Sequence, residues 1–154
     1  FSQGVIESAR QAIREGSSII TDTNMVKAGI NGERLSVYGG KVHCFMADED
    51  VAVQARARGI TRAAVSMEKS AMMGENYIYA IGNAPTALFR LYDLIAEEKV
   101  FPRLIIGVPV GFVHVAEAKE LIMQAPVPYI VARGRKGGSN VAAAICNALL
   151  YGME

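Results

Sequence analysis

The sequence predicts an α/β fold, in which two layers of helices enclose one mainly parallel β-sheet. Short apolar segments rich in Ile and Val, typical of strands buried on both faces, alternate with longer segments of helical periodicity. This alternation favours right-handed crossovers and a three-layer α/β/α sandwich. The chain has 154 residues, of which 51% are hydrophobic and 20% charged, so it can bury a substantial core. We expect residues 1–154 to form a single domain.

Each element has its own signal in the sequence. The first helix is indicated by apolar residues on one face, and it should end at Gly16: Val5, Ile6, Ala9, Ala12 and Ile13. Five apolar segments predict strands at 18–21, 41–46, 77–81, 103–108 and 129–132. Further helices are expected at 48–58, 61–73, 116–124 and 140–151, with a short one that ends at Gly29 and another that begins near Pro85.

The segment 81–89, I-G-N-A-P-T-A-L-F, joins a buried strand directly to a helix. We expect the side-chain oxygen of Asn83 to cap this helix and Pro85 to occupy its first turn, where a missing N–H costs little. The turn should point backbone N–H groups outward at the carboxyl end of the strand. Ligands of open parallel sheets bind at such ends.

Two further loops follow predicted strands. In T-D-T-N-M-V (21–26), Asp22 or Thr23 can cap the short helix, although capping explains one polar residue better than four. In G-V-P-V-G-F (107–112), a stiff turn and a ligand contact are about equally compatible with the pattern. Phe112 could form a flat apolar wall for a planar ligand, but taken alone a core position is the safer interpretation.

The segment R-G-R-K-G-G-S (133–139) follows the last strand and leads into a helix at Ser139. Glycines allow the backbone to form a nest of N–H groups, and the helix N-terminus adds partial positive charge. A solvated basic turn is the alternative, but the position after a strand favours a cradle for carboxylates or phosphates. Arg62, near another helix start, would hold a carboxylate bidentately if the fold brings it to the same edge.

Several classes of function are disfavoured. A net charge of +1 gives no reason to expect nucleic acid as a partner. No apolar run reaches the length of a membrane span and the start does not resemble a signal peptide, so we expect a cytoplasmic protein without a membrane partner. Cys44 and Cys146 are expected to be small core residues in a reducing compartment. His43 and His114 have neither triad nor metal-ligand spacing, and we expect no metal. Dinucleotide, P-loop and G-x-S-x-G motifs are absent.

Five motifs together closely resemble the precorrin-8X methylmutase family. They are T-D-T-N-M-V-K-A-G-I (21–30), G-I-T-R (59–62), I-G-N-A-P-T-A-L-F (81–89), G-V-P-V-G-F-V (107–113) and G-R-K-G-G-S (134–139), and they follow the family order along the whole chain. The resemblance implies a flavodoxin-like fold with a five-stranded sheet, a homodimer, and an isomerase of cobalamin biosynthesis. Such enzymes move a methyl group from C11 to C12 of precorrin-8X or cobalt-precorrin-8, giving hydrogenobyrinic or cobyrinic acid, and use no cofactor.

The resemblance also bears on catalysis. Family members carry the histidine for proton transfer in an R-x-x-H motif, within an N-terminal segment that precedes the position of Phe1. His43 does not match this motif, so no catalytic residue is assigned in this chain. Two positions depart from the family pattern: His114 replaces a common glycine, and Ala118 replaces a common serine in the triplet 117–119.

The implied substrate, a flat macrocycle ringed by acetate and propionate groups, needs apolar walls, neutral hydrogen bonds and cations. We expect these from Thr23, Met25, Arg62, Asn83, Thr86, Gly111, Phe112, Arg135, Lys136 and Ser139. Two alternatives remain open. One is a non-catalytic tetrapyrrole-binding relative, and the other is a flavodoxin-like module that binds a phosphorylated small molecule at 134–139.

Overall fold

The computed structural model describes residues 1–74 and 76–153. Five parallel strands form one sheet in the order β2-β1-β3-β4-β5, which is the flavodoxin-like order. Their bounds are β1 (Ile19–Thr21), β2 (Val42–Cys44), β3 (Ile78–Ile81), β4 (Leu104–Gly107) and β5 (Tyr129–Val131). The parallel sheet that the sequence predicts is therefore confirmed.

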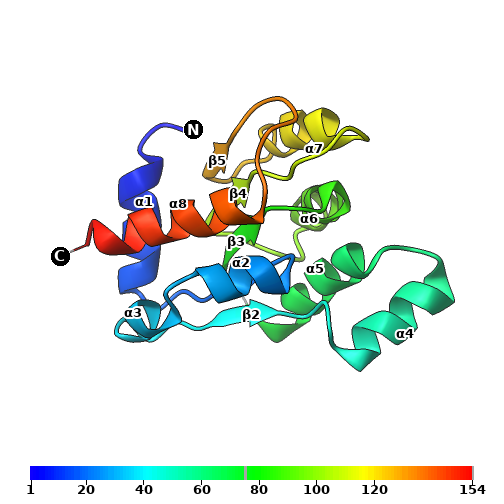
Figure 1. The fold of residues 1–154 in the computed structure, drawn as a ribbon, viewed down its shortest axis with the longest axis horizontal. Coiled ribbons are helices and arrows are strands. Elements are labelled where there is room, and N and C mark those ends of the chain that lie inside the picture. The colour runs from blue at the N-terminus through cyan, green and yellow to red at the C-terminus, as the bar shows by residue number, and fades with distance from the viewer. Residues whose placement is uncertain (75, 154) are drawn as a thin grey trace.

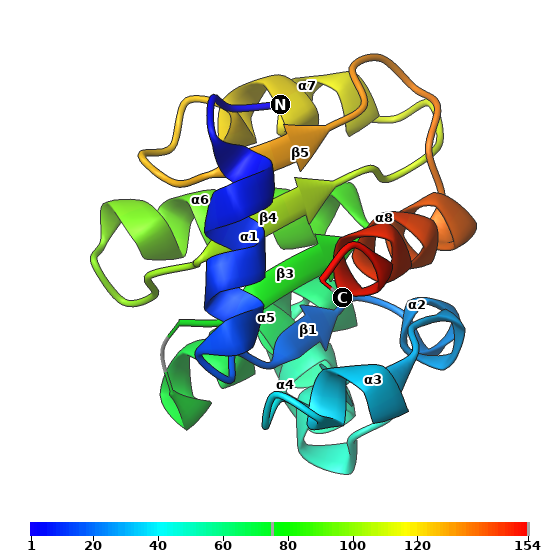
Figure 2. The same cartoon turned by 90° about the vertical axis from the view of Figure 1, so that its left-hand side faces the viewer.

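Helices cover both faces of the sheet (Figure 1). On one face lie α1 (Val5–Arg14), α2 (Asn24–Gly29), α3 (Gly32–Ser36) and α8 (Ser139–Tyr151). On the other lie α4 (Glu49–Arg58), α5 (Arg62–Met73), α6 (Pro85–Ala96) and α7 (Val115–Ile122). Figure 2 shows α1 and α8 in front of the sheet, with α5 and α6 behind it.

Alternate strand residues supply the two cores. Ile19, Ile78 and Leu104 belong to the apolar cluster beneath α1 and α8. Tyr79 and Ile105 belong to the cluster on the opposite face. Since β3 and β4 are buried along their whole length, their residues are apolar on both faces, which explains why they form continuous apolar runs in the sequence.

The edges of the sheet differ from the sequence expectation. Strand β2 covers only part of the expected 41–46, because its partner β1 ends at Thr21, opposite Cys44. Cys146 is buried as expected, but the expectation of a core position for Cys44 is wrong: as part of an edge strand it is only half-buried. The short helix α3, capped by the side chain of Asn31, was not expected.

All strands point the same way, so their carboxyl ends lie along one edge of the molecule, to the right in Figure 2. The chain leaves β1 toward β2 and later returns on the other side of β1 as β3. The carboxyl ends of β1 and β3 therefore form the topological switch point, where open α/β sheets bind ligands. Among the described residues, no helix is both long and apolar enough to cross a membrane.

Candidate functional site

A buried carboxylate occupies the switch point. Asp22 follows β1 directly and has no exposed surface. Its two oxygens accept hydrogen bonds from the backbone N–H groups of Gly82, Asn83 and Ala84 at 2.9, 2.9 and 2.7 Å. Burial raises the pKa of the Asp22 carboxyl, and the three N–H bonds partly oppose that rise.

The contacts of Asp22 correct two expectations. The N-cap residue of α6 is Ala84, and the side chain of Asn83 does not cap the helix, because the carboxylate from the neighbouring strand takes that role. The N–H groups of residues 82–84 are also not free for a ligand, since Asp22 already accepts from them. Pro85 does occupy the first turn, as expected.

The end of β1 also contacts the start of α8. Thr23 is the N-cap of α2, accepting from the N–H of Val26 at 3.0 Å, and its hydroxyl lies 3.1 Å from that of Ser139. Gly82 allows this close approach, because a Cβ there would lie 2.7 Å from the Cα of Ser139. The ends of β1, β3 and α8 thus meet at one point.

The loops after β4 and β5 form a joined pair. Gly138 donates its N–H to the carbonyl of Val108 at 2.7 Å, and Gly111 donates to the carbonyl of Arg135 at 3.2 Å. Gly137 has a φ of 159°, and a Cβ there would collide with the carbonyl oxygen of Val108. The pair is therefore a close backbone-to-backbone contact that requires glycine.

Side chains on these loops face solvent. The guanidinium of Arg135 lies 5.7 Å from the ring centre of Phe112, a cation–π contact. Phe112 is 82% exposed, so of its two interpretations the core position is wrong. Lys136 is also exposed, and Met25, at the start of α2, is 64% exposed. The edge thus combines exposed apolar side chains with cations.

Lys119 of α7 is a functional candidate that the sequence reasoning missed. Its side chain is fully buried, and its Nζ donates to the backbone carbonyls of Gly134 and Lys136 at 2.9 and 2.8 Å. Burial lowers the pKa of this amine. A lysine inside an apolar helical pattern was the available signal, but its partners are 15 and 17 residues away in the chain.

Arg62 and Thr86 lie at the starts of neighbouring helices. The hydroxyl of Thr61, the N-cap of α5, donates to that of Thr86 at 2.8 Å. Arg62 is exposed, and its guanidinium lies 3.4 Å from the carbonyl of Met46, just beyond β2. A hollow of about 300 Å³ opens beside the two threonines and is bounded by Phe89.

A chain of contacts thus connects the loop after β2 to the loop after β5. It runs from Arg62 through the adjacent Thr61 to Thr86 at the start of α6. Asp22 binds the turn that leads into the same helix. From there it passes through Thr23 and Ser139 to the paired loops of Gly111 and Arg135. The segments joined by these contacts carry all ten expected binding residues, and they lie at the carboxyl edge of the sheet.

The two histidines differ in setting. The ring of His43 stacks on Phe45, and burial, followed by the charges of Lys27 and Lys41, lowers its pKa. His114 precedes α7 with a φ of 61°, a left-handed conformation that favours glycine, and its Nδ1 lies 3.4 Å from a carboxylate oxygen of Glu117. Among residues 1–74 and 76–153, no cluster of His, Cys, Asp and Glu is suited to hold a metal ion.

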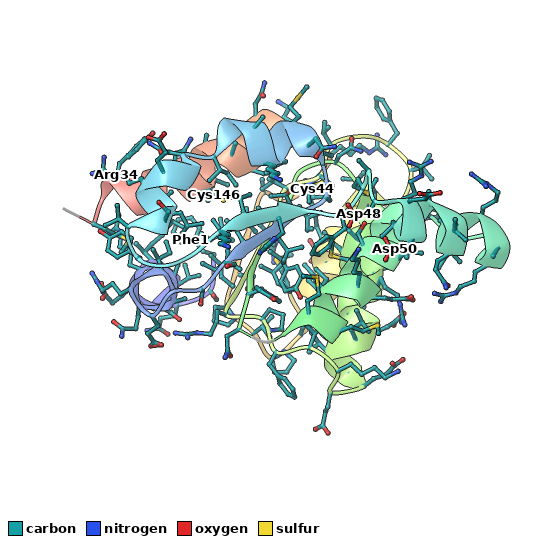
Figure 3. All side chains as sticks on the ribbon, turned by 90° about the horizontal axis from the view of Figure 1, so that it is seen from below. Phe1, Arg34, Cys44, Asp48, Asp50 and Cys146 are labelled. Carbon is teal, nitrogen blue, oxygen red and sulfur yellow. The ribbon has the colours of Figure 1, made fainter. Side chains whose placement is uncertain are left out.

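A separate cavity of about 850 Å³ lies between α4 and α5. Asp48 and Asp50 lie together beside the start of α4 (Figure 3), and both pair with Lys69, at 2.7 and 3.0 Å. The cavity is also lined by exposed Val53 and Met72. Helix α4 stands at the periphery of the molecule (Figure 1), and the lining of this cavity includes none of the ten expected binding residues.

Comparisons with known proteins agree with the motifs. The profile of the precorrin-8X methylmutase family matches residues 1–152. The cobalt-precorrin-8 methylmutase of Leptospira interrogans is 46% identical, with 94% of this chain and 70% of that protein aligned. The cobalt-precorrin-8 methylmutase of Salmonella typhimurium is 45% identical, with 98% of this chain and 70% of that protein aligned. For the relative from Priestia megaterium, the chain spans 66% of its length.

Solved structures give the same result. The precorrin-8X methylmutase of Thermus thermophilus superposes with a TM-score of 0.89 at 39% identity, covering 98% of this chain and 74% of that one. A precorrin-8X methylmutase related protein superposes with a TM-score of 0.87 at 34% identity. Sequence profile, relatives and fold agree, and the chain therefore belongs to the precorrin-8X methylmutase family, whose members are isomerases of cobalamin biosynthesis.

Proposed function

We propose that this chain binds precorrin-8X or cobalt-precorrin-8 at the carboxyl edge of its sheet and isomerises it by moving a methyl group from C11 to C12. The product is hydrogenobyrinic acid or, with cobalt present, cobyrinic acid. The observation that carries the proposal is the contact chain, because it places the five family motifs along one edge. A flat ligand can span such an edge and contact several loops at once.

The side chains at this edge suit a macrocycle with acidic substituents. Phe112, which follows Gly111, and Met25, at the start of α2, provide exposed apolar surface for the ring. Arg62, Arg135 and Lys136 provide exposed cations for acetate and propionate groups. Neutral hydrogen bonds come from Asn83, Thr86, Thr23 and Ser139.

The reaction is intramolecular, so substrate and product have the same atoms and the site needs no redox partner. The chain's task is then to orient the ring and exclude water while the methyl group migrates. We assign the proton-transferring role to neither His43 nor His114, because neither matches the family's R-x-x-H motif.

The decisive experiment is incubation of the full-length gene product with precorrin-8X and, separately, with cobalt-precorrin-8, while the absorption spectrum is recorded. Conversion to the product spectrum is expected, and an unchanged spectrum with folded protein contradicts the proposal. Binding of the product without turnover would instead favour the non-catalytic relative. Thermal stabilisation by flavin phosphate or nucleotide, with none by corrinoids, would favour the phosphate-binding module.

We further propose that residues 1–154 act as one domain of a homodimer in the cytoplasm, where Cys44 and Cys146 would remain reduced thiols. Large apolar side chains exposed around α4 and α5 support association, among them Val53 at 51% and Met72 at 88%. Light scattering should give twice the monomer mass at micromolar concentration. A monomer mass would contradict the dimer, and Met72→Lys should shift the equilibrium toward monomer if this face is used.

A further inference from the structure

Two charged side chains are fully buried among the described residues, and both lie at the carboxyl edge. Asp22 binds the N–H groups of residues 82–84, and Lys119 binds the carbonyls of residues 134 and 136. Each therefore fixes the backbone of one loop. Asp22 takes the role of a helix cap. Lys119 lies in the last turn of α7, but its ammonium binds the carbonyls of another loop and none of its own helix, so its burial needs another explanation.

The contacts of Lys119 determine which way the loop backbone faces. The carbonyls of Gly134 and Lys136 point inward to its ammonium, and the carbonyl between them, that of Arg135, accepts from Gly111. Three consecutive carbonyl oxygens therefore each accept a hydrogen bond from the protein. An anion that approaches the loop from solvent meets the exposed side chains of Arg135 and Lys136, while these partially negative oxygens are engaged by protein donors.

Lys119 also has no acidic partner among the residues that the structure describes. No carboxylate in residues 1–74 and 76–153 lies within ion-pair distance of its Nζ. Glu117 contacts His114, and Glu120 contacts Arg133, at 3.4 and 3.5 Å. Burying an ammonium on neutral carbonyls costs free energy, and an anion bound on the other side of the loop would recover part of it through the low local dielectric.

We propose that Lys119 is a positioning residue for the acidic groups of the corrinoid. It holds the loop 133–139 by binding the carbonyls of Gly134 and Lys136, and it adds a buried positive charge beside the loop. This inference rests on the proposed function and specifies which part of the site recognises carboxylates. It predicts that Lys119 discriminates between acidic and esterified forms of one macrocycle.

The test uses the full-length protein and two probes, hydrogenobyrinic acid and its fully methylated ester, titrated by absorption. In Lys119→Met the affinity for the acid should fall about tenfold or more, which corresponds to about 1.4 kcal/mol, while the affinity for the ester should change less than twofold. Lys119→Arg, which keeps the charge, should recover most of the lost affinity. The control is Lys99→Met, because Lys99 is exposed and pairs with Glu97 far from the loop.

Unchanged acid affinity in Lys119→Met overturns the inference, and an equal loss for acid and ester reduces Lys119 to a structural role. If the wild type binds neither probe, the proposed function itself fails and the inference fails with it.

If Lys119→Met does not fold, a second experiment measures the affinity for each probe as a function of pH in protein that retains Lys119. The protein carries Lys136→Arg, so that the lysine of the loop itself does not contribute to the pH dependence. Arginine side chains stay charged throughout this range, and ordinary carboxyl and imidazole groups titrate well below it. Acid affinity should then fall at a pH below the ordinary lysine range while ester affinity stays flat, and a flat acid profile contradicts the proposal.

Discussion

Replacement of Asp22 by alanine should strongly destabilise the protein, because it leaves three buried or partly buried N–H groups without an acceptor. Hydrogen bonds to a charged group contribute about 1.5–3 kcal/mol each, so the gross loss is about 5–9 kcal/mol. The variant no longer has to desolvate a carboxylate, which offsets several kcal/mol. We therefore expect a net loss of about 3–5 kcal/mol.

Asp22→Asn should lower the free energy of unfolding by less, about 2 kcal/mol, because the amide oxygen still accepts hydrogen bonds. Its NH₂ group, however, faces a backbone N–H that can only donate. Urea denaturation followed by circular dichroism measures both losses, and hydrogen exchange should show faster exchange at residues 82–84. Asp93→Asn is the matched control, since Asp93 lies exposed on α6, and it should change the unfolding free energy by less than about 0.5 kcal/mol. A cost below about 1 kcal/mol for Asp22→Ala, or unchanged exchange at 82–84, would refute this reasoning.

Three further outcomes are expected. Arg62→Ala should weaken binding of hydrogenobyrinic acid by about 1.5–3 kcal/mol through loss of a charged hydrogen bond, and an unchanged Kd removes Arg62 from the site. Glu68→Gln should cost about 1 kcal/mol at neutral pH, because Arg58 and Arg90 lower the pKa of the Glu68 carboxyl. The stability from this ion pair is present above the unfolded-state pKa of Glu near 4.3, and it is lost as the pH falls through the lowered pKa of the folded state. The free energy of unfolding of the variant should therefore fall less steeply at acid pH than that of the wild type. An identical acid dependence contradicts the assignment. His114→Gly should raise the unfolding free energy by about 0.5–1 kcal/mol by relieving a left-handed φ of 61°, whereas His114→Ala should not; equal effects would exclude backbone strain as the cause.

The sequence alone was sufficient for the architecture, because local signals are consistent with the fold throughout. Strands β3 and β4 are apolar on both faces since helices cover both sides of a parallel sheet, and this burial leaves a continuous run of apolar residues. Thr23 caps α2 and Pro85 opens α6, as the local patterns predict. The five motifs and their order along the chain indicate the family without reference to the fold.

The partners of buried polar groups were decided by tertiary structure. The sequence suggested Asn83 as the cap of α6, but the acceptor is Asp22, 60 residues or more away along the chain from the N–H groups it binds. A cap from a neighbouring strand has no local signature, because it depends on the strand order that places β1 beside β3. The same holds for the bond between Thr61 and Thr86 and for the edge position that leaves Cys44 half-buried.

The chemistry of the carboxyl edge therefore has two origins. The sequence determines which residue types are available at this edge. They are the glycines, the exposed Phe112 and the cations of Arg62, Arg135 and Lys136. Only the tertiary structure decides which backbone groups remain free to bind a ligand. Asp22 accepts hydrogen bonds from the N–H groups of one loop, and Lys119 donates to the carbonyls of another. Side-chain identity is local, whereas the satisfaction of buried polar groups depends on every element that packs around them.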